Sequence, residues 1–83
     1  MNSLYEQVFK RDGWKCRHCC CRILHPHHVI FKSHGGEDTL NNLISLCPSC
    51  HAAVHQKKLV LEVLQVLEND VIVKFTRVRG WKP

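Results

Sequence analysis

The sequence predicts a small α+β domain that is stabilised by a bound metal, and three observations lead to this fold class. The chain has 83 residues, too few for an apolar core alone to give more than marginal stability. Two Cys-x-x-Cys pairs are separated by 27 residues, an arrangement that suits one shared metal ion. Helical patterns alternate with β-prone runs, and the last two β-prone runs flank a turn.

The six cysteines could instead form disulfides, as cysteines do in small secreted proteins. The N-terminal residues show no apolar signal segment, however, and no run approaches the length of a membrane span. We therefore expect a cytoplasmic protein whose cysteines bind metal. The net charge of +5 would fall to +3 with four thiolates and one Zn²⁺. A surface with this net positive charge is compatible with a polyanionic binding partner but does not require one.

A short helix is predicted for residues 3–10 near the N-terminus. Leu4 and Val8 fall on one stripe of this helix, so we expect that stripe to pack on the core. Ser3 can cap the start of the helix, and Gly13 can supply the left-handed residue that ends it.

The two Cys-x-x-Cys pairs predict a structural zinc site, because two cysteines three apart in a tight turn can both bind one tetrahedral ion. The site would use four thiolates, from Cys16, Cys19, Cys47 and Cys50. Cys20 remains an alternative ligand in place of Cys19. We otherwise expect Cys20 and Cys21 to be small buried side chains, and His18 to be exposed within its turn.

The middle of the chain predicts β-structure followed by a loop. Residues 23–32 form two strand pieces interrupted near Pro26, and the run Val29, Ile30 and Phe31 is strongly β-prone. The Gly-Gly pair that follows lets the backbone turn sharply and approach another segment closely.

The C-terminal third predicts a β-hairpin. Residues 59–67 and 71–78 are β-rich and flank a Glu-Asn-Asp turn. Leu and Glu make a helix the competing interpretation of the first run, but its valines and the strand that follows favour a strand. We expect one domain in two parts, a core of residues 1–57 and a hairpin of residues 58–83. Because the first run is apolar on both faces, it should pack on the core or on a second copy of the chain.

A three-histidine metal site is predicted around the second cysteine pair. Residues 50–57 show a helical pattern, and His51 and His55 are four residues apart, so both imidazoles project from one helix face. With His27 as a third ligand, the ion would keep open positions for water and a phosphate oxygen.

His28 is predicted to point away from that ion, because adjacent strand residues face opposite sides. An imidazole that is neutral near pH 7 can take a proton from water, so His28 is a candidate general base. Asn42 could hold His28, or the loop beside it, by hydrogen bonding.

The order and spacing of these residues are similar to those of the HNH endonuclease family. The resemblance spans about residues 5–56, two thirds of the chain. Phe31 departs from the pattern, where the family often has proline, and so does Cys20, where glycine is frequent. The matching residues are Cys16, Cys19, His27, His28, Gly35, Gly36, Asp38, Asn42, Leu43, Leu46, Cys47, Cys50, His51 and His55.

The resemblance implies a ββα-metal, or His-Me finger, fold and hydrolysis of phosphodiester bonds in DNA, leaving a 5′-phosphate and a 3′-hydroxyl. It makes His28 the general base and Asn42 the residue that anchors the loop. It makes His27, His51 and His55 the ligands of a catalytic divalent ion, and it assigns structural Zn²⁺ to the four cysteines.

Several alternatives remain open at this point. The catalytic ion could be Mg²⁺, Mn²⁺, Ni²⁺ or Zn²⁺, and cleavage could nick one strand or cut both, the latter through a homodimer formed by the hairpin. A phage or mobile-element setting is compatible with the chain. The main rival is a non-catalytic zinc-ribbon module that binds nucleic acid or protein. It explains the cysteines but not the histidines and Asn42 at these spacings. A redox protein using the run of three cysteines is a third reading.

Overall fold

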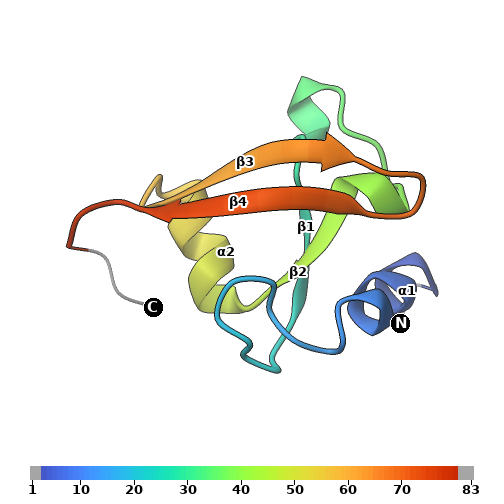
Figure 1. The fold of residues 1–83 in the computed structure, drawn as a ribbon, viewed down its shortest axis with the longest axis horizontal. Coiled ribbons are helices and arrows are strands. Elements are labelled where there is room, and N and C mark those ends of the chain that lie inside the picture. The colour runs from blue at the N-terminus through green and yellow to red at the C-terminus, as the bar shows by residue number, and fades with distance from the viewer. Residues whose placement is uncertain (1–2, 81–83) are drawn as a thin grey trace.

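Two helices and two small antiparallel sheets make up the computed structural model, which describes residues 3–80 (Figure 1). The predicted α+β fold class is therefore confirmed. In chain order the elements are α1 (Ser3–Arg11), β1 (His25–His28), η1 (Lys32–His34), η2 (Leu40–Asn42), β2 (Leu43–Leu46), α2 (Pro48–His55), β3 (Leu59–Val66) and β4 (Val71–Arg77), where η1 and η2 are short 3₁₀ turns.

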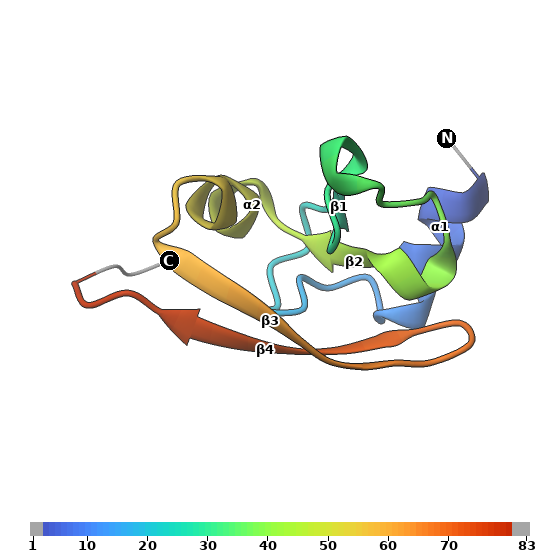
Figure 2. The same ribbon diagram turned by 90° about the horizontal axis from the view of Figure 1, so that it is seen from above.

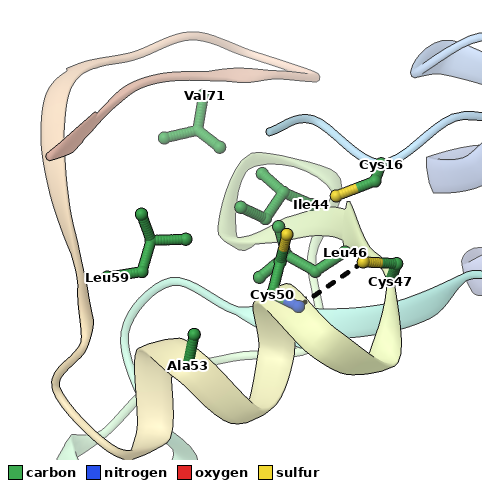
Figure 3. Packing of buried hydrophobic residues seen from close by; sticks show 8 residues of the cluster. All are labelled: Cys16, Ile44, Leu46, Cys47, Cys50, Ala53, Leu59 and Val71. Carbon is green, nitrogen blue, oxygen red and sulfur yellow. Dashed lines mark hydrogen bonds between the residues drawn. The ribbon is translucent and has the colours of Figure 1, made fainter. Parts of the chain in front are cut away.

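The elements lie in two layers, as Figure 2 shows. One layer holds α1, the β1–β2 ribbon and α2, and the long β3–β4 hairpin runs beneath it. The main core forms between the layers, where Leu59 and Val71 of the hairpin meet Ile44 and Leu46 of β2 and three buried cysteines (Figure 3). The apolar surface that the hairpin contributes thus covers the cysteine cluster.

Pro26 lies inside strand β1, so the predicted interruption of the strand at this residue is wrong. It pairs with Ser45 of β2. The amide of Ser45 donates instead to Asp12, and its carbonyl accepts from Arg17. Because both backbone groups of Ser45 point away from β1, Pro26 needs no N–H at this position.

The β-prone run Val29, Ile30 and Phe31 does not form a strand, which corrects the second prediction for this segment. Strand β1 ends at His28, and the chain then bends away from β2. The carbonyl of Phe31 accepts the amides of His34 and Gly36, which closes a tight turn. Turn hydrogen bonds made by later residues therefore outweigh the β propensity of these side chains.

Helix α1 is anchored through Asp12, the residue just after its last turn. The Asp12 side chain is 2% exposed and accepts hydrogen bonds from Arg11, Arg17 and the amide of Ser45. Burial alone would raise the pKa of Asp12, but these donors outweigh it and lower the pKa. Gly13 follows with φ of 72°, as predicted for a left-handed helix end. The helix begins at Ser3 itself.

The hairpin is formed as strands, so the helical alternative for its first run is wrong. Strands β3 and β4 pair antiparallel with an irregularity between Val63 and Gln65. Residues 81–83 of the predicted hairpin segment lie outside the described residues. Among residues 3–80, no helix is long and apolar enough to cross a membrane.

Candidate metal centres and active site

Four cysteines converge in the core, brought together by two turns. One turn follows α1, and the other leads into α2, where Cys47 caps the helix. The four Sγ atoms, of Cys16, Cys19, Cys47 and Cys50, all lie within 4.8 Å of one another. Zn–S bonds of about 2.3 Å in a tetrahedron require sulfurs roughly 3.8 Å apart, so the cluster fits Zn²⁺ with little movement. Figure 3 shows three of these sulfurs facing one another.

The electrostatics of the cluster also favour a cation. The amides of His18 and Cys50 point at the sulfurs of Cys16 and Cys47, each at 3.4 Å. Burial would raise the pKa of Cys47, but the Cys50 amide and the neighbouring thiols lower it to about 7, whereas burial raises the pKa of Cys50. A divalent cation would offset the repulsion between neighbouring thiolates, because it stabilises all four of them together.

Cys19, and not Cys20, completes the cluster, which resolves the alternative left open by the sequence. The expectation that Cys20 is buried is wrong: it is exposed and has φ of 66°. Its amide donates to the Cys16 carbonyl, and the left-handed conformation turns the backbone back to Cys21, whose carbonyl accepts the Cys16 amide. Cys20 therefore serves the turn, and Cys21 is half-buried.

His18 was expected to be exposed, but it is half-buried between the cysteine cluster and the hairpin. Its Nδ1 lies 3.3 Å from the sulfur of Cys50, and its ring lies 5.2 Å from the ring of Phe75. Burial, followed by the charge of Arg77, lowers the pKa of His18. The hairpin packs over this turn, and its Phe75 covers the ring of His18.

Three histidines form a second cluster at the other end of α2. His27 extends from β1, and His51 and His55 extend from α2, and their ring nitrogens lie within 4.8 Å of one another. The Nε2 atoms of His51 and His55 are 3.0 Å apart. Two like nitrogens this close suit a shared proton or a shared metal ion, since their lone pairs otherwise repel. The cluster borders an open pocket of about 510 Å³.

Burial favours the neutral, metal-binding form of two of these imidazoles, those of His27 and His51. His27 is 2% exposed, and burial, together with the nearby His51, His55 and His28, lowers its pKa to about 4. Burial likewise lowers the pKa of His51, with His55 and His25 adding to the effect. Neutral imidazoles are the ligands of divalent ions, so the donor set fits a three-histidine site with open positions on the pocket side.

His28 lines the same pocket but has a different partner. Its Nε2 lies 2.5 Å from Oδ1 of Asp38, whose Oδ2 lies 3.0 Å from Nζ of Lys32. The hydrogen bond from His28, then that from Lys32, lowers the pKa of Asp38. Sequence reasoning matched Asp38 to the motif without seeing this contact. The contact occupies one ring nitrogen of His28 and leaves the other available.

Asn42 is buried and holds the loop between His28 and itself. Its Oδ1 accepts the amide of Ile30, and its Nδ2 donates to the carbonyls of Ile30 and Glu37. Gly36 packs so tightly on this loop that a Cβ would lie 1.7 Å from the Ile30 carbonyl oxygen. The prediction of a close approach at the Gly-Gly pair is thus confirmed. Asn42 contacts the loop and not the His28 ring.

Replacing Asn42 by aspartate tests this anchor. Asn42→Asp removes two donors and places a carboxylate against two carbonyls, so we expect the free energy of unfolding to fall by about 1–3 kcal/mol or more. Urea unfolding followed by circular dichroism measures the change. Asn41→Asp, at the half-exposed neighbouring position, is the matched control. Equal unfolding midpoints for the two variants would contradict the anchoring role.

The contacts of Phe31 with the histidine cluster were also not predicted from the sequence. Its ring stacks on that of His55, with centroids 5.3 Å apart and planes inclined by 13°. It also meets His27 edge-on at 5.9 Å. Its place in the sequence, where the family often has proline, was the available signal. Of the two remaining histidines, His25 lies edge-on to His51 at 5.8 Å, and His34 lies beside Phe31.

Comparison with known proteins identifies the family of the chain. The sequence model of the HNH endonuclease family matches residues 13–57, more than half of the chain and all seven proposed metal ligands. The chain therefore belongs to the HNH endonuclease family, as the resemblance indicated. The matched residues include both the four-cysteine cluster and the three-histidine cluster.

Two relatives place the chain more closely. It is 46% identical over 44 residues to the type IV methyl-directed restriction enzyme EcoKMcrA of Escherichia coli. The aligned residues make up 53% of this chain and 16% of that enzyme. It is 32% identical over 60 residues to anaredoxin of Nostoc sp.. The aligned residues make up 70% of this chain and 79% of that protein. No solved structure gives a significant match to the chain.

Proposed function

We propose that this chain is a metal-dependent DNA endonuclease that hydrolyses phosphodiester bonds. One observation carries the proposal: three histidine rings converge on one pocket that a fourth histidine, His28, also lines. A zinc-binding fold would be stable without this arrangement, because the four cysteines supply the structural site separately.

In this proposal His27, His51 and His55 hold the divalent ion. A divalent ion held there would supply positive charge to stabilise the scissile phosphate and the departing 3′-oxygen. His28 takes a proton from the attacking water through Nδ1, because Nε2 donates to Asp38 in that tautomer. Asp38 thereby orients the base, as the carboxylate does in other histidine-based sites. Asn42 acts through the loop backbone, by fixing the segment that carries Asp38.

A single copy of the chain presents one such site, so a lone protomer would nick one strand. Cutting both strands requires two sites, and exposed apolar side chains near the hairpin turn support pairing of two copies. Leu64 and Val66, for example, are 59% and 57% exposed. The order in which nicked and linear products appear reports on this pairing.

Conversion of supercoiled plasmid to nicked and linear forms tests the proposal. A weak chelator removes the ion from the histidine site, and metal analysis confirms that the cysteine site stays loaded. Addition of Mg²⁺, Mn²⁺, Ni²⁺ or Zn²⁺ should restore nicking in the wild type and in His34→Ala, a control histidine outside the ligand set. None of these ions should restore nicking in His51→Ala, because this variant lacks one of the three ligands. A wild type that binds plasmid but nicks it with no metal would favour the non-catalytic zinc module.

A further inference from the structure

A second, apolar groove lies directly behind the proposed active site. It encloses about 320 Å³, and its walls include Leu59, Val60 and Leu61 of β3 and Val54 of α2. His27 and Phe31 line both this groove and the pocket of the three histidines. The two spaces therefore meet at a shared wall, and a ligand bound at the metal can extend into the groove.

Phe31 makes that wall rigid. Its stacking on His55 and its edge-on contact with His27 hold the ring between the two spaces. An aromatic ring fixed in this way offers its remaining surface to the groove at little entropic cost. Phe31 therefore connects the groove, whose far wall is strand β3 of the hairpin, to the active-site pocket.

The charges around the groove suit nucleic acid. Among the described residues that line it, none is acidic, and Lys57 contributes an exposed ammonium. Lys58 follows, and Lys32 lines the adjacent pocket. An apolar floor beside lysines is the combination that single-stranded nucleic-acid sites use: cations track the phosphates, and apolar or aromatic groups contact the bases.

We propose that this groove binds an unstacked nucleobase of the DNA substrate, from the nucleotide next to the scissile phosphate. The inference rests on the proposed function, which places that phosphate in the histidine pocket. The neighbouring nucleotide is covalently joined to that phosphate, and the pocket and the groove share the wall formed by His27 and Phe31, so its base is the one placed to enter the groove.

Two consequences define the substrate class. A base can enter the groove only after it leaves its stack, which costs least in single-stranded or unpaired DNA. The enzyme therefore prefers such DNA to regular duplex. The aliphatic walls contact the faces of a base and cannot distinguish base edges by hydrogen bonds. Cleavage is therefore tolerant of sequence at this nucleotide.

Two matched variants on strand β3 test the groove. Val60 lines it and Val63 does not, although the two side chains are 42% and 43% exposed. Val60→Asp places a carboxylate where the base would lie, and Val63→Asp adds the same charge to the same strand. Circular dichroism and metal analysis establish that both variants fold and keep the cysteine-bound metal.

Cleavage is measured on one sequence prepared as a single strand, as a duplex, and as a duplex with a central unpaired bubble. We expect kcat/KM for single-strand and bubble DNA to exceed that for duplex at least tenfold. We expect Val60→Asp to lower these two values about tenfold, because a carboxylate in the groove opposes a bound base, and Val63→Asp to leave them within twofold. Equal rates on all substrates, or equal effects of both variants, would overturn the inference while nicking itself persists.

A binding measurement separates the inference from the proposed function. The probe is a bubble oligonucleotide containing 2-aminopurine, whose fluorescence rises when the base unstacks. A rise with wild type and Val63→Asp but not with Val60→Asp supports the groove, even if no DNA is cut. If Val60→Asp instead alters the oligomeric state and gives the same rise in fluorescence as the wild type, the groove binds a second copy of the chain and the inference is wrong.

Discussion

Removal of the metal from the four-cysteine site is expected to unfold the protein. The ligands lie in the main core, where Cys50 is fully buried and Leu59 and Val71 pack on the cluster. Structural zinc contributes about 10–16 kcal/mol of apparent binding free energy in zinc-finger peptides. This is as large as the whole stability of a typical domain, about 5–15 kcal/mol. Cys47→Ser, or a strong chelator, should therefore abolish the cooperative thermal transition seen by circular dichroism.

Cys20→Ser is the matched control, because Cys20 is exposed and outside the cluster. We expect it to retain the metal and to change the free energy of unfolding by less than about 0.5 kcal/mol, as surface substitutions do. Metal analysis of the wild-type protein should detect bound zinc. Iron in its place would favour a redox centre, since four thiolates can hold either metal. A Cys47→Ser variant that melts like the wild type would refute the structural role of the cluster.

The clustering of most of these cysteines and histidines could be predicted because their geometry is local. Cys16 and Cys19 share one turn, and Cys47 and Cys50 share another, so spacing alone brings each pair together. His51 and His55 share a helix face for the same reason. Spacing could not decide between Cys19 and Cys20. That choice depends on the left-handed backbone at Cys20, which points its side chain to solvent.

The features that the sequence did not reveal depend on contacts between distant segments. Asp12 gathers Arg17 and the Ser45 amide from two other elements, and no local pattern signals this network. Strand β1 ends early because Asn42 binds Ile30 from twelve residues away. His18 is covered only because the hairpin folds back over its turn. In each case tertiary hydrogen bonds or packing override local propensity.

A large effect on the chemical step itself is expected from His28→Ala. A positioned general base contributes about 10²–10⁴-fold to a proton transfer, so kcat for nicking should fall by that factor. KM and the affinity for the divalent ion should change little, because His28 is not among the three clustered ring nitrogens. Single-turnover cleavage of a labelled oligonucleotide, with metal affinity measured by titration calorimetry, separates the two quantities.

Asp38→Ala extends this test from the base to the carboxylate that orients it. Removing the partner of a functional histidine costs about 10–100-fold in comparable sites, so kcat should fall less than in His28→Ala. The double variant should be no slower than His28→Ala alone, since Asp38 acts only through that ring. Glu37→Ala, at the exposed acidic neighbour, is the control. If Asp38→Ala raised KM and left kcat unchanged, Asp38 and Lys32 would be placing the substrate, and the orientation of His28 would need another source.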